Sequence, residues 1–145
     1  MTGGELCTNT LWCENYNDRT IISNNSGMTF VEKAPMPLLR KGHCAVFLNN
    51  STVMVIGGYY YPLSYKHTYF YDLDTDTWTK GPDMTVHRSY HTCNVITDCD
   101  GNQKVVVVAG VGNGGGISTT SYETSVEIYD VTSGSWSAGK EEKMI

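Results

Sequence analysis

One spacing occurs twice in this chain and constrains its fold more than any other feature. An aromatic residue is followed ten positions later by an arginine, and the arginine is followed three positions later by a histidine. The residues are Phe30, Arg40 and His43 in the first copy and Trp78, Arg88 and His91 in the second. A repeat of this kind indicates stacked copies of one supersecondary unit.

Further landmarks follow each histidine in the same order. An apolar run ends in a pair of small residues, an aromatic residue then precedes an aspartate, and a tryptophan lies six residues after that aspartate. The landmarks are Gly57-Gly58, Tyr71-Asp72 and Trp78 in the first copy, and Ala109-Gly110, Tyr129-Asp130 and Trp136 in the second. The second copy is longer only between its landmarks, and this is where a repeat scaffold varies its binding surface.

Each copy is predicted to form four short strands. These runs are rich in Val, Ile, Tyr, Thr and Trp and are bounded by Gly, Asn, Asp and Pro, which is typical of strands. The predicted strands are 43–48, 53–57, 68–71 and 77–80 in the first copy, and 91–97, 104–109, 125–129 and 135–137 in the second. Val105 to Val108 are apolar without alternation, so we expect this strand to be covered on both faces. No segment of about twelve residues has the 3.6-residue period of an amphipathic helix, so an all-β chain is predicted.

These residues resemble a known family. The segment from Arg40 to Met84 resembles a kelch repeat, and the segment from Arg88 to Gly139 resembles a second. Thr20 to Pro37 resembles the last half of a preceding unit. The resemblance implies a β-propeller in which each repeat forms a four-stranded blade around a central channel.

We therefore predict an all-β fold, a partial kelch-type β-propeller of four-stranded antiparallel blades. The expected organisation is an unassigned leader (1–19), a degenerate half blade (20–39), a first kelch repeat (40–87) and a second (88–145). In the half blade, Asn24 and Phe30 occupy the positions at which the later copies have Asp and Trp.

The landmark residues are expected to have structural roles. A glycine pair at a strand end allows positive φ and the close approach of a neighbouring blade. Ala109 replaces the first glycine of this pair in the second copy. The two tryptophans offer large apolar surfaces for packing between sheets, and each indole N–H needs a partner. Asp72 and Asp130 are placed to accept backbone N–H bonds in the turns that follow them.

The length of the chain raises a question about its assembly. Its 145 residues hold two and a half units, whereas propellers typically close with about four to eight blades. Such an array leaves sheet faces and edges uncovered. Two explanations stay open at this point: the sequence is a piece of a larger parent chain, or homo-oligomerisation closes the ring.

Charge and hydropathy exclude two classes of partner. Ten basic and fifteen acidic residues make the chain mildly negative, so no nucleic acid partner is expected. No apolar stretch approaches the roughly 18 residues of a membrane span. Met1 to Tyr16 shows neither the basic region nor the apolar region of a signal peptide.

The cysteines give only partial guidance. The chain has five, namely Cys7, Cys13, Cys44, Cys93 and Cys99. Cys44 and Cys93 lie in predicted first strands, where we expect them to act as small buried hydrophobes. Cys93 and Cys99 cannot bridge within one extended strand, because six residues span about 20 Å and a disulfide needs Cα atoms within about 7 Å.

Sequons for N-glycosylation begin at Asn24, Asn49 and Asn50. The last two fall in a predicted turn, which is the exposed kind of site that a glycan needs. Asparagine also suits such turns for backbone reasons alone. Cytoplasmic and secreted locations are therefore not distinguished by the sequence.

The sequence contains no recognisable enzyme signature. Neither G-x-S-x-G, H-E-x-x-H nor a P-loop is present, and no cofactor or metal is predicted. His43 and His91 occupy equivalent repeat positions, so we expect a scaffold role such as hydrogen bonding to the backbone. The glycine-rich run from Val111 to Gly116 is interpreted as a flexible insertion because no helix start follows it.

Strand alternation predicts a surface for a protein partner. Loops of an antiparallel meander alternate between its two ends, so the loop after the second strand shares one end with the segment between units. Tyrosine and arginine dominate binding energy at protein interfaces. The candidate partner-binding residues at this end are Arg40, Tyr59, Tyr60, Tyr61, Tyr65, Arg88, Tyr90 and Tyr122. Two alternatives stay open, because the tyrosines could pack on the blade edge and the arginines could brace the segments between blades.

The predicted function is therefore a non-enzymatic protein–protein interaction module. The resemblance implies two settings, an adaptor for ubiquitin ligation that would need a BTB domain, or a secreted or surface protein used in adhesion. An alternative from another class is a copper oxidase of the galactose oxidase type. That alternative implies a copper site with Tyr and His ligands and a cross-linked Cys. No set of residues in the sequence supports such a site.

Overall fold

The computed structural model describes residues 18–23, 29–113 and 120–139. Within these ranges the secondary structure consists of short antiparallel strands and no helix. The all-β fold predicted from the repeat is therefore confirmed. No helix in the described ranges is long and apolar enough to cross a membrane.

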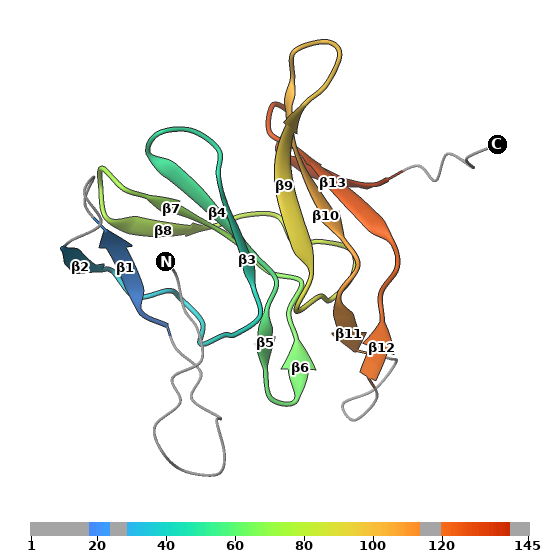
Figure 1. The fold of residues 1–145 in the computed structure, drawn as a ribbon, viewed down its shortest axis with the longest axis horizontal. Coiled ribbons are helices and arrows are strands. Elements are labelled where there is room, and N and C mark those ends of the chain that lie inside the picture. Colours follow the sequence, from blue (N-terminus) through green and yellow to red (C-terminus); the bar gives the residue numbers. More distant parts are fainter. Residues whose placement is uncertain (1–17, 24–28, 114–119, 140–145) are drawn as a thin grey trace.

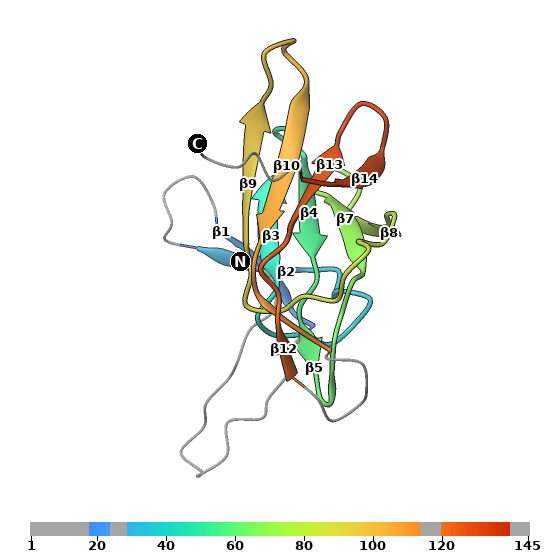
Figure 2. The same cartoon turned by 90° about the vertical axis from the view of Figure 1, so that its right-hand side faces the viewer.

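Two four-stranded sheets form the body of the molecule and stand side by side (Figures 1 and 2). Blade 1 has the strand order β3 (Cys44–Phe47), β4 (Thr52–Ile56), β7 (Thr68–Asp72) and β8 (Thr77–Lys80). Blade 2 has the order β9 (Thr92–Thr97), β10 (Gln103–Val108), β13 (Val126–Asp130) and β14 (Ser135–Ala138). All eight strands lie within two residues of their predicted bounds.

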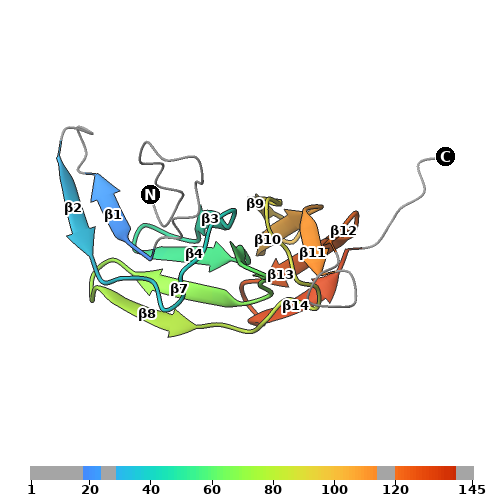
Figure 3. The ribbon, with the colours of Figure 1, turned by 90° about the horizontal axis from the view of Figure 1, so that it is seen from below.

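A two-stranded sheet precedes blade 1 and lies against it, so that the three sheets form a curved row (Figure 3). It consists of β1 (Thr20–Ser23) and β2 (Phe30–Lys33). Ser23 pairs with Phe30, as Tyr71 pairs with Trp78 in blade 1. The two strands are therefore paired like the last two strands of blade 1, and we call this sheet the half blade.

Two small hairpins continue the blades beyond their sheets, and the sequence did not predict them. The first consists of β5 (Tyr59–Tyr60) and β6 (Leu63–Ser64), and the second of β11 (Val111–Asn113) and β12 (Thr120–Tyr122). The interpretation of Val111 to Gly116 as a flexible insertion is wrong for Val111–Asn113, which pair with β12. The remainder of that run lies outside the described residues.

The largest apolar core lies between blades 1 and 2. Met54 and Ile56 of β4 pack with Val105 and Val107 of β10, and Met84 of the connecting segment completes the cluster. The apolar side chains of β4 are buried on both faces of the sheet. The same expectation for β10 is wrong, because Val108 remains 36% exposed on the face that no described blade covers.

The turn residues act as predicted. The Asp72 carboxylate accepts hydrogen bonds from the backbone N–H groups of Asp74 and Thr75, both at 2.9 Å. Asp130 does the same for Thr132 and Ser133 at 2.8 and 3.0 Å. These bonds satisfy donors that the tight turns would otherwise leave unpaired, and they lower the pKa of the Asp72 carboxyl group. The pKa of Asp130 is lowered first by its hydrogen bond from Lys104 and then by the turn bonds.

A disulfide bond joins Cys44 to Cys93, with their Cα atoms 6.1 Å apart. The expectation that these residues are free buried hydrophobes is therefore wrong. Cys44 begins β3 and Cys93 lies in β9, so the bond links the first strands of the two blades. Cys99 is a free, exposed cysteine.

Candidate functional site

One end of the two blades gathers the hairpins and the segments that connect the blades. The β5–β6 and β11–β12 hairpins point to the same end in Figure 1, away from the β9–β10 turn. Lys41 forms a bridge with Tyr59, and Ser89 forms one with Val111, so each connecting segment runs beside a hairpin. We call this region the hairpin end and the opposite end of the blades the turn end.

The two hairpins are joined to each other by a small polar network. The Ser64 N–H donates to Asn113 Oδ1 at 2.8 Å, and Asn113 Nδ2 donates to the Ser64 carbonyl at 3.0 Å. Ser64 and Ser89 share a buried hydroxyl–hydroxyl hydrogen bond of 2.9 Å. Because these contacts connect both hairpins to a connecting segment, the hairpin end is held as one unit.

Four of the predicted tyrosines are well exposed at this end. The exposed fractions are 40% for Tyr60, 67% for Tyr61, 60% for Tyr90 and 84% for Tyr122. Leu63, which pairs with Tyr60, is 38% exposed, and Leu39 in the segment before blade 1 is 40% exposed. The hairpin end therefore presents large apolar side chains that a partner can cover.

Tyr59 and Tyr65 are half-buried and contribute more to the base of the hairpin than to its surface. The Tyr65 ring lies 5.4 Å from the His67 ring and 5.4 Å from the guanidinium carbon of Arg40. The sequence allowed either partner contact or packing on the blade edge for these two tyrosines. Their half-buried positions favour packing on the blade edge.

Tyr90 adopts an unusual backbone conformation, with φ at 53°. This is the left-handed region, which is costly for a residue with a side chain. The equivalent residue of the first repeat is Gly42, whose φ is 61°. The Tyr90 ring packs directly over Gly42, where a Cβ would come within 2.9 Å of it. The strained tyrosine is thus held by packing while most of its ring faces outward.

Arg40 and Arg88 are fully buried. Arg40 Nη1 donates to the Gly57 carbonyl at 2.7 Å. Arg88 Nη1 donates to the Ala109 and Ser125 carbonyls at 3.0 and 2.9 Å. The sequence allowed either partner contact or bracing of the segments between blades for these arginines. Their burial favours bracing.

The surroundings of the two arginines differ at one equivalent position. Arg88 faces Glu127 at 3.6 Å, and the Glu127 carboxylate also accepts bonds from Thr85 Oγ1 at 2.6 Å and from the backbone of Thr85 and Val86. Blade 1 has Tyr69 at that position, with its ring centroid 5.1 Å from the Arg40 guanidinium carbon. A buried cation is thus balanced by a carboxylate in one blade and by aromatic rings in the other.

His91 is buried in the junction between the blades, with 8% of its surface exposed. Its ring nitrogens have no partner in strict hydrogen-bonding geometry among the described residues, but the Ile56 backbone lies close enough to act on the ring as a hydrogen-bond acceptor. Burial, together with Arg88 and His43, lowers the pKa of His91 to about 4. His91 is therefore a neutral packing residue at physiological pH.

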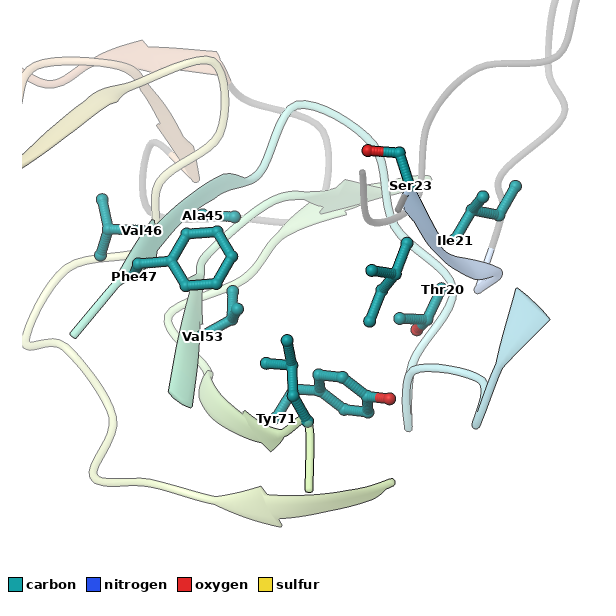
Figure 4. Close-up of a pocket in the computed structure, with 10 residues that line it drawn as sticks. Thr20, Ile21, Ser23, Ala45, Val46, Phe47, Val53 and Tyr71 are labelled. Carbon is teal, nitrogen blue, oxygen red and sulfur yellow. The ribbon is translucent and has the colours of Figure 1, made fainter. Parts of the chain in front are cut away.

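A cavity of about 350 Å³ opens between β1 and blade 1 (Figure 4). Its walls are mainly apolar and include Ala45, Phe47 and Val53. Tyr71 also borders it, and its hydroxyl donates to Asp76 at 2.6 Å. A complete blade would place its two inner strands here, and the half blade has none in the described part of the chain. The cavity offers space without the convergent polar groups of a catalytic site.

The described cysteines are not placed for the Tyr–Cys cross-link of a copper centre of the galactose oxidase type. Within the described ranges, no three His, Cys, Asp or Glu side chains lie where they could hold a metal ion. Cys44 and Cys93 are bonded to each other, and Cys99 is exposed in the turn after β9. No described cysteine is thus in place for a cross-link to a tyrosine ligand.

Comparison with known proteins agrees with the geometry of the blades. Residues 39–85 match the family model of the kelch motif. Two curated proteins named galactose oxidase, both from Gibberella zeae, are 30% identical to this chain over 89 residues. The match covers 61% of this chain and 11% of each relative. The chain thus spans about a tenth of the length of the curated relatives that it matches.

The matched segment contains blade 1, and blade 2 repeats the same strand order and the same pairing of tyrosine with tryptophan. Residues 39–85 are therefore similar to a kelch motif, and the two four-stranded sheets have the fold of blades in a partial kelch-type β-propeller.

Proposed function

We propose that this chain is a non-enzymatic protein-interaction module that binds a protein partner with its hairpin end. Tyr60, Tyr61, Tyr90 and Tyr122 would supply the contacts. The half-buried Tyr59 and Tyr65 and the buried Arg40 and Arg88 would support them from below.

One observation carries this proposal: exposed tyrosines gather on a base that is already ordered. Tyrosine gives a large contact area at a low cost in side-chain entropy. The network of Ser64, Ser89 and Asn113 fixes the two hairpins relative to each other. A surface that is ordered before binding loses less entropy when a partner docks.

The test uses three forms of the full chain to capture proteins from the native cell or tissue and compares what each form captures. These are the unaltered chain, the double variant Tyr60→Ser/Tyr61→Ser and the matched control Ile96→Ser. Ile96 is also an exposed hydrophobic residue, at 45%, but it lies in β9 near the turn end. Quantitative mass spectrometry after crosslinking would measure which proteins each form captures.

We expect specific partners to be captured by the unaltered chain and by the control, and to be lost with the double variant. Equal unfolding midpoints of all three forms would show that the loss comes from the surface. Recovery of the same partners in equal amounts by all three forms would contradict the proposed site. A copper-dependent oxidase activity of the endogenous protein would contradict the proposed function itself.

A further inference from the structure

The turn between β3 and β4 contains two overlapping sequons. One begins at Asn49 and needs Ser51, and the other begins at Asn50 and needs Thr52. The turn is closed by a backbone bond from Leu48 N–H to the Thr52 carbonyl at 2.9 Å. Asn49 and Asn50 are both exposed, so the folded chain leaves room for a glycan there.

The two asparagines have different roles in this turn. Asn49 Oδ1 accepts hydrogen bonds from the backbone N–H groups of Ser51 and Thr52 at 2.9 and 2.8 Å. It therefore fixes the turn, as asparagine often does. The Asn50 side chain makes no hydrogen bond within the described residues. A substituent on Asn50 Nδ2 would leave every contact of the turn in place.

A second, independent observation indicates the compartment in which glycans are attached. The Cys44–Cys93 disulfide joins the two blades. Disulfides form and persist in oxidising environments and are rare in the cytosol. Disulfide formation and N-glycosylation both take place in the secretory pathway, so the two features belong together.

The position of the turn is compatible with binding at the hairpin end. The β3–β4 turn lies at the turn end of blade 1, opposite the β5–β6 hairpin (Figure 1). The equivalent turn of blade 2, at residues 98–102, carries no sequon. A glycan on blade 1 would thus leave the tyrosine surface uncovered.

We propose that Asn50 carries an N-linked glycan and that this chain matures in the oxidising secretory pathway. The donor is an oligosaccharide linked to a lipid diphosphate. The bond from the sugar anomeric carbon to the phosphate oxygen breaks, and a bond to Asn50 Nδ2 forms. Asn50 loses one amide proton, and the lipid diphosphate leaves. This proposal does not depend on the partner-binding proposal.

The first test maps the modification on the endogenous protein. Removal of N-glycans by a peptide N-glycosidase in heavy-oxygen water converts a glycosylated asparagine into a labelled aspartate, and peptide sequencing by mass spectrometry then locates the label. We expect the label at Asn50. A label at Asn49 alone, or a wholly unmodified peptide, would overturn the proposal.

A second test separates the two sequons while both asparagines remain. The full chain would be secreted from animal cells behind a cleavable signal sequence, with Asn24→Gln in every form. Ser51→Ala removes only the sequon at Asn49, and Thr52→Val removes only the sequon at Asn50. We expect the glycosidase-sensitive mass shift to persist with Ser51→Ala and to vanish with Thr52→Val. The reverse pattern, or no shift in any form, would refute the assignment.

The compartment is tested by blocking thiols before the endogenous protein is extracted. We expect a peptide pair linked through Cys44 and Cys93 under non-reducing conditions. Recovery of both cysteines as blocked free thiols would show a reducing compartment and would overturn the second half of the proposal.

Discussion

The described sheets meet at two junctions, one between blades 1 and 2 and one between the half blade and blade 1. The same kinds of contact stabilise both junctions, but to different extents. In the junction of blades 1 and 2, Trp136 Nε1 donates to the Pro82 carbonyl at 3.1 Å. In the junction of the half blade and blade 1, Trp78 Nε1 donates to the Ala34 carbonyl at 2.9 Å. A methionine from the connecting segment is buried in each, Met84 in the first and Met36 in the second. The outer part of a junction is thus complete even when only two strands precede it.

The inner part of the junction differs. Between blades 1 and 2 it contains the Cys44–Cys93 bond and the packing of Val95 on the core. Beside the half blade, the same region is the cavity bordered by Ala45 and Phe47, and Phe47 is 61% exposed. Outer strands thus fix the spacing of two blades, whereas the inner strands close the space between them.

We call the junction of blades 1 and 2 the full junction. The largest effect is expected from removal of the Cys44–Cys93 disulfide, which lies in this junction. In the double variant Cys44→Ala/Cys93→Ala, the free energy of unfolding should fall by about 4 kcal/mol, because the crosslink closes a long loop of sequence separation 49. Denaturant unfolding of the variant and of the reduced unaltered chain would measure it. A loss in the variant that is not matched by reduction would mean that packing at these positions matters more than the crosslink.

A glycine in the full junction should tolerate no side chain. In Gly57→Ala, the new Cβ would lie 2.4 Å from the Arg88 carbonyl oxygen and 2.7 Å from His91 Cε1, at a positive φ of 61°. We expect a loss of about 3 kcal/mol from overpacking and backbone strain.

Ala109 is the matched control, because it is the equivalent residue of blade 2 and has the same φ of 61°. Ala109→Gly should stabilise the chain by about 1 kcal/mol through relief of the left-handed conformation. Thermal unfolding of both variants would test the pair. A tolerated Gly57→Ala would show that the close approach of the following blade is not what requires glycine.

The full junction should also weaken in acid because of His91. Its pKa is about 4 in the folded chain, below about 6.5 in an unfolded chain. Between these values the unfolded state binds more protons, so stability is present above pH 6.5 and is lost as the pH falls towards 4. We expect a loss of about 2 kcal/mol between pH 7 and pH 5 from this residue. Denaturant unfolding of the unaltered chain and of His91→Gln would isolate it, and equal pH slopes would contradict it.

The smallest effects come from equivalent residues of the two inner strands. Val95→Ala in the full junction should cost about 1 kcal/mol, since Val95 packs against the core and each lost methyl group removes buried surface. Phe47→Ala beside the half blade should change stability by less than about 0.5 kcal/mol, because its ring is largely exposed. Equal losses in the two variants would show that the space beside Phe47 is filled in solution.

The repeat spacing was sufficient to predict the blades, because the strands and turns depend on local residues. Asp72 and Asp130 bond within their own turns, and the tryptophans pair with tyrosines at a fixed offset. The hairpins were missed because strands of two or three residues are stabilised by contacts with distant segments. The bond from Ser64 to Asn113 joins residues in different repeats and has no local pattern.

The disulfide was missed for a related reason, although the sequence contained a hint. Cys44 and Cys93 are not equivalent, since the residue equivalent to Cys44 is Thr92. Side chains alternate between the two faces of a strand, so an offset of one residue turns the two cysteines to opposite faces of their sheets. When the sheets stack, those faces meet. Recognising this needs the stacking order of the blades, which no single strand encodes.

The link between the two hairpins affects the kinetics of any complex formed at the hairpin end. Because Ser64 and Asn113 tie the hairpins together before a partner arrives, the encounter needs no slow rearrangement on this side. Association rates would then vary little among variants of this surface, and differences in affinity would appear mainly as differences in the lifetime of the complex.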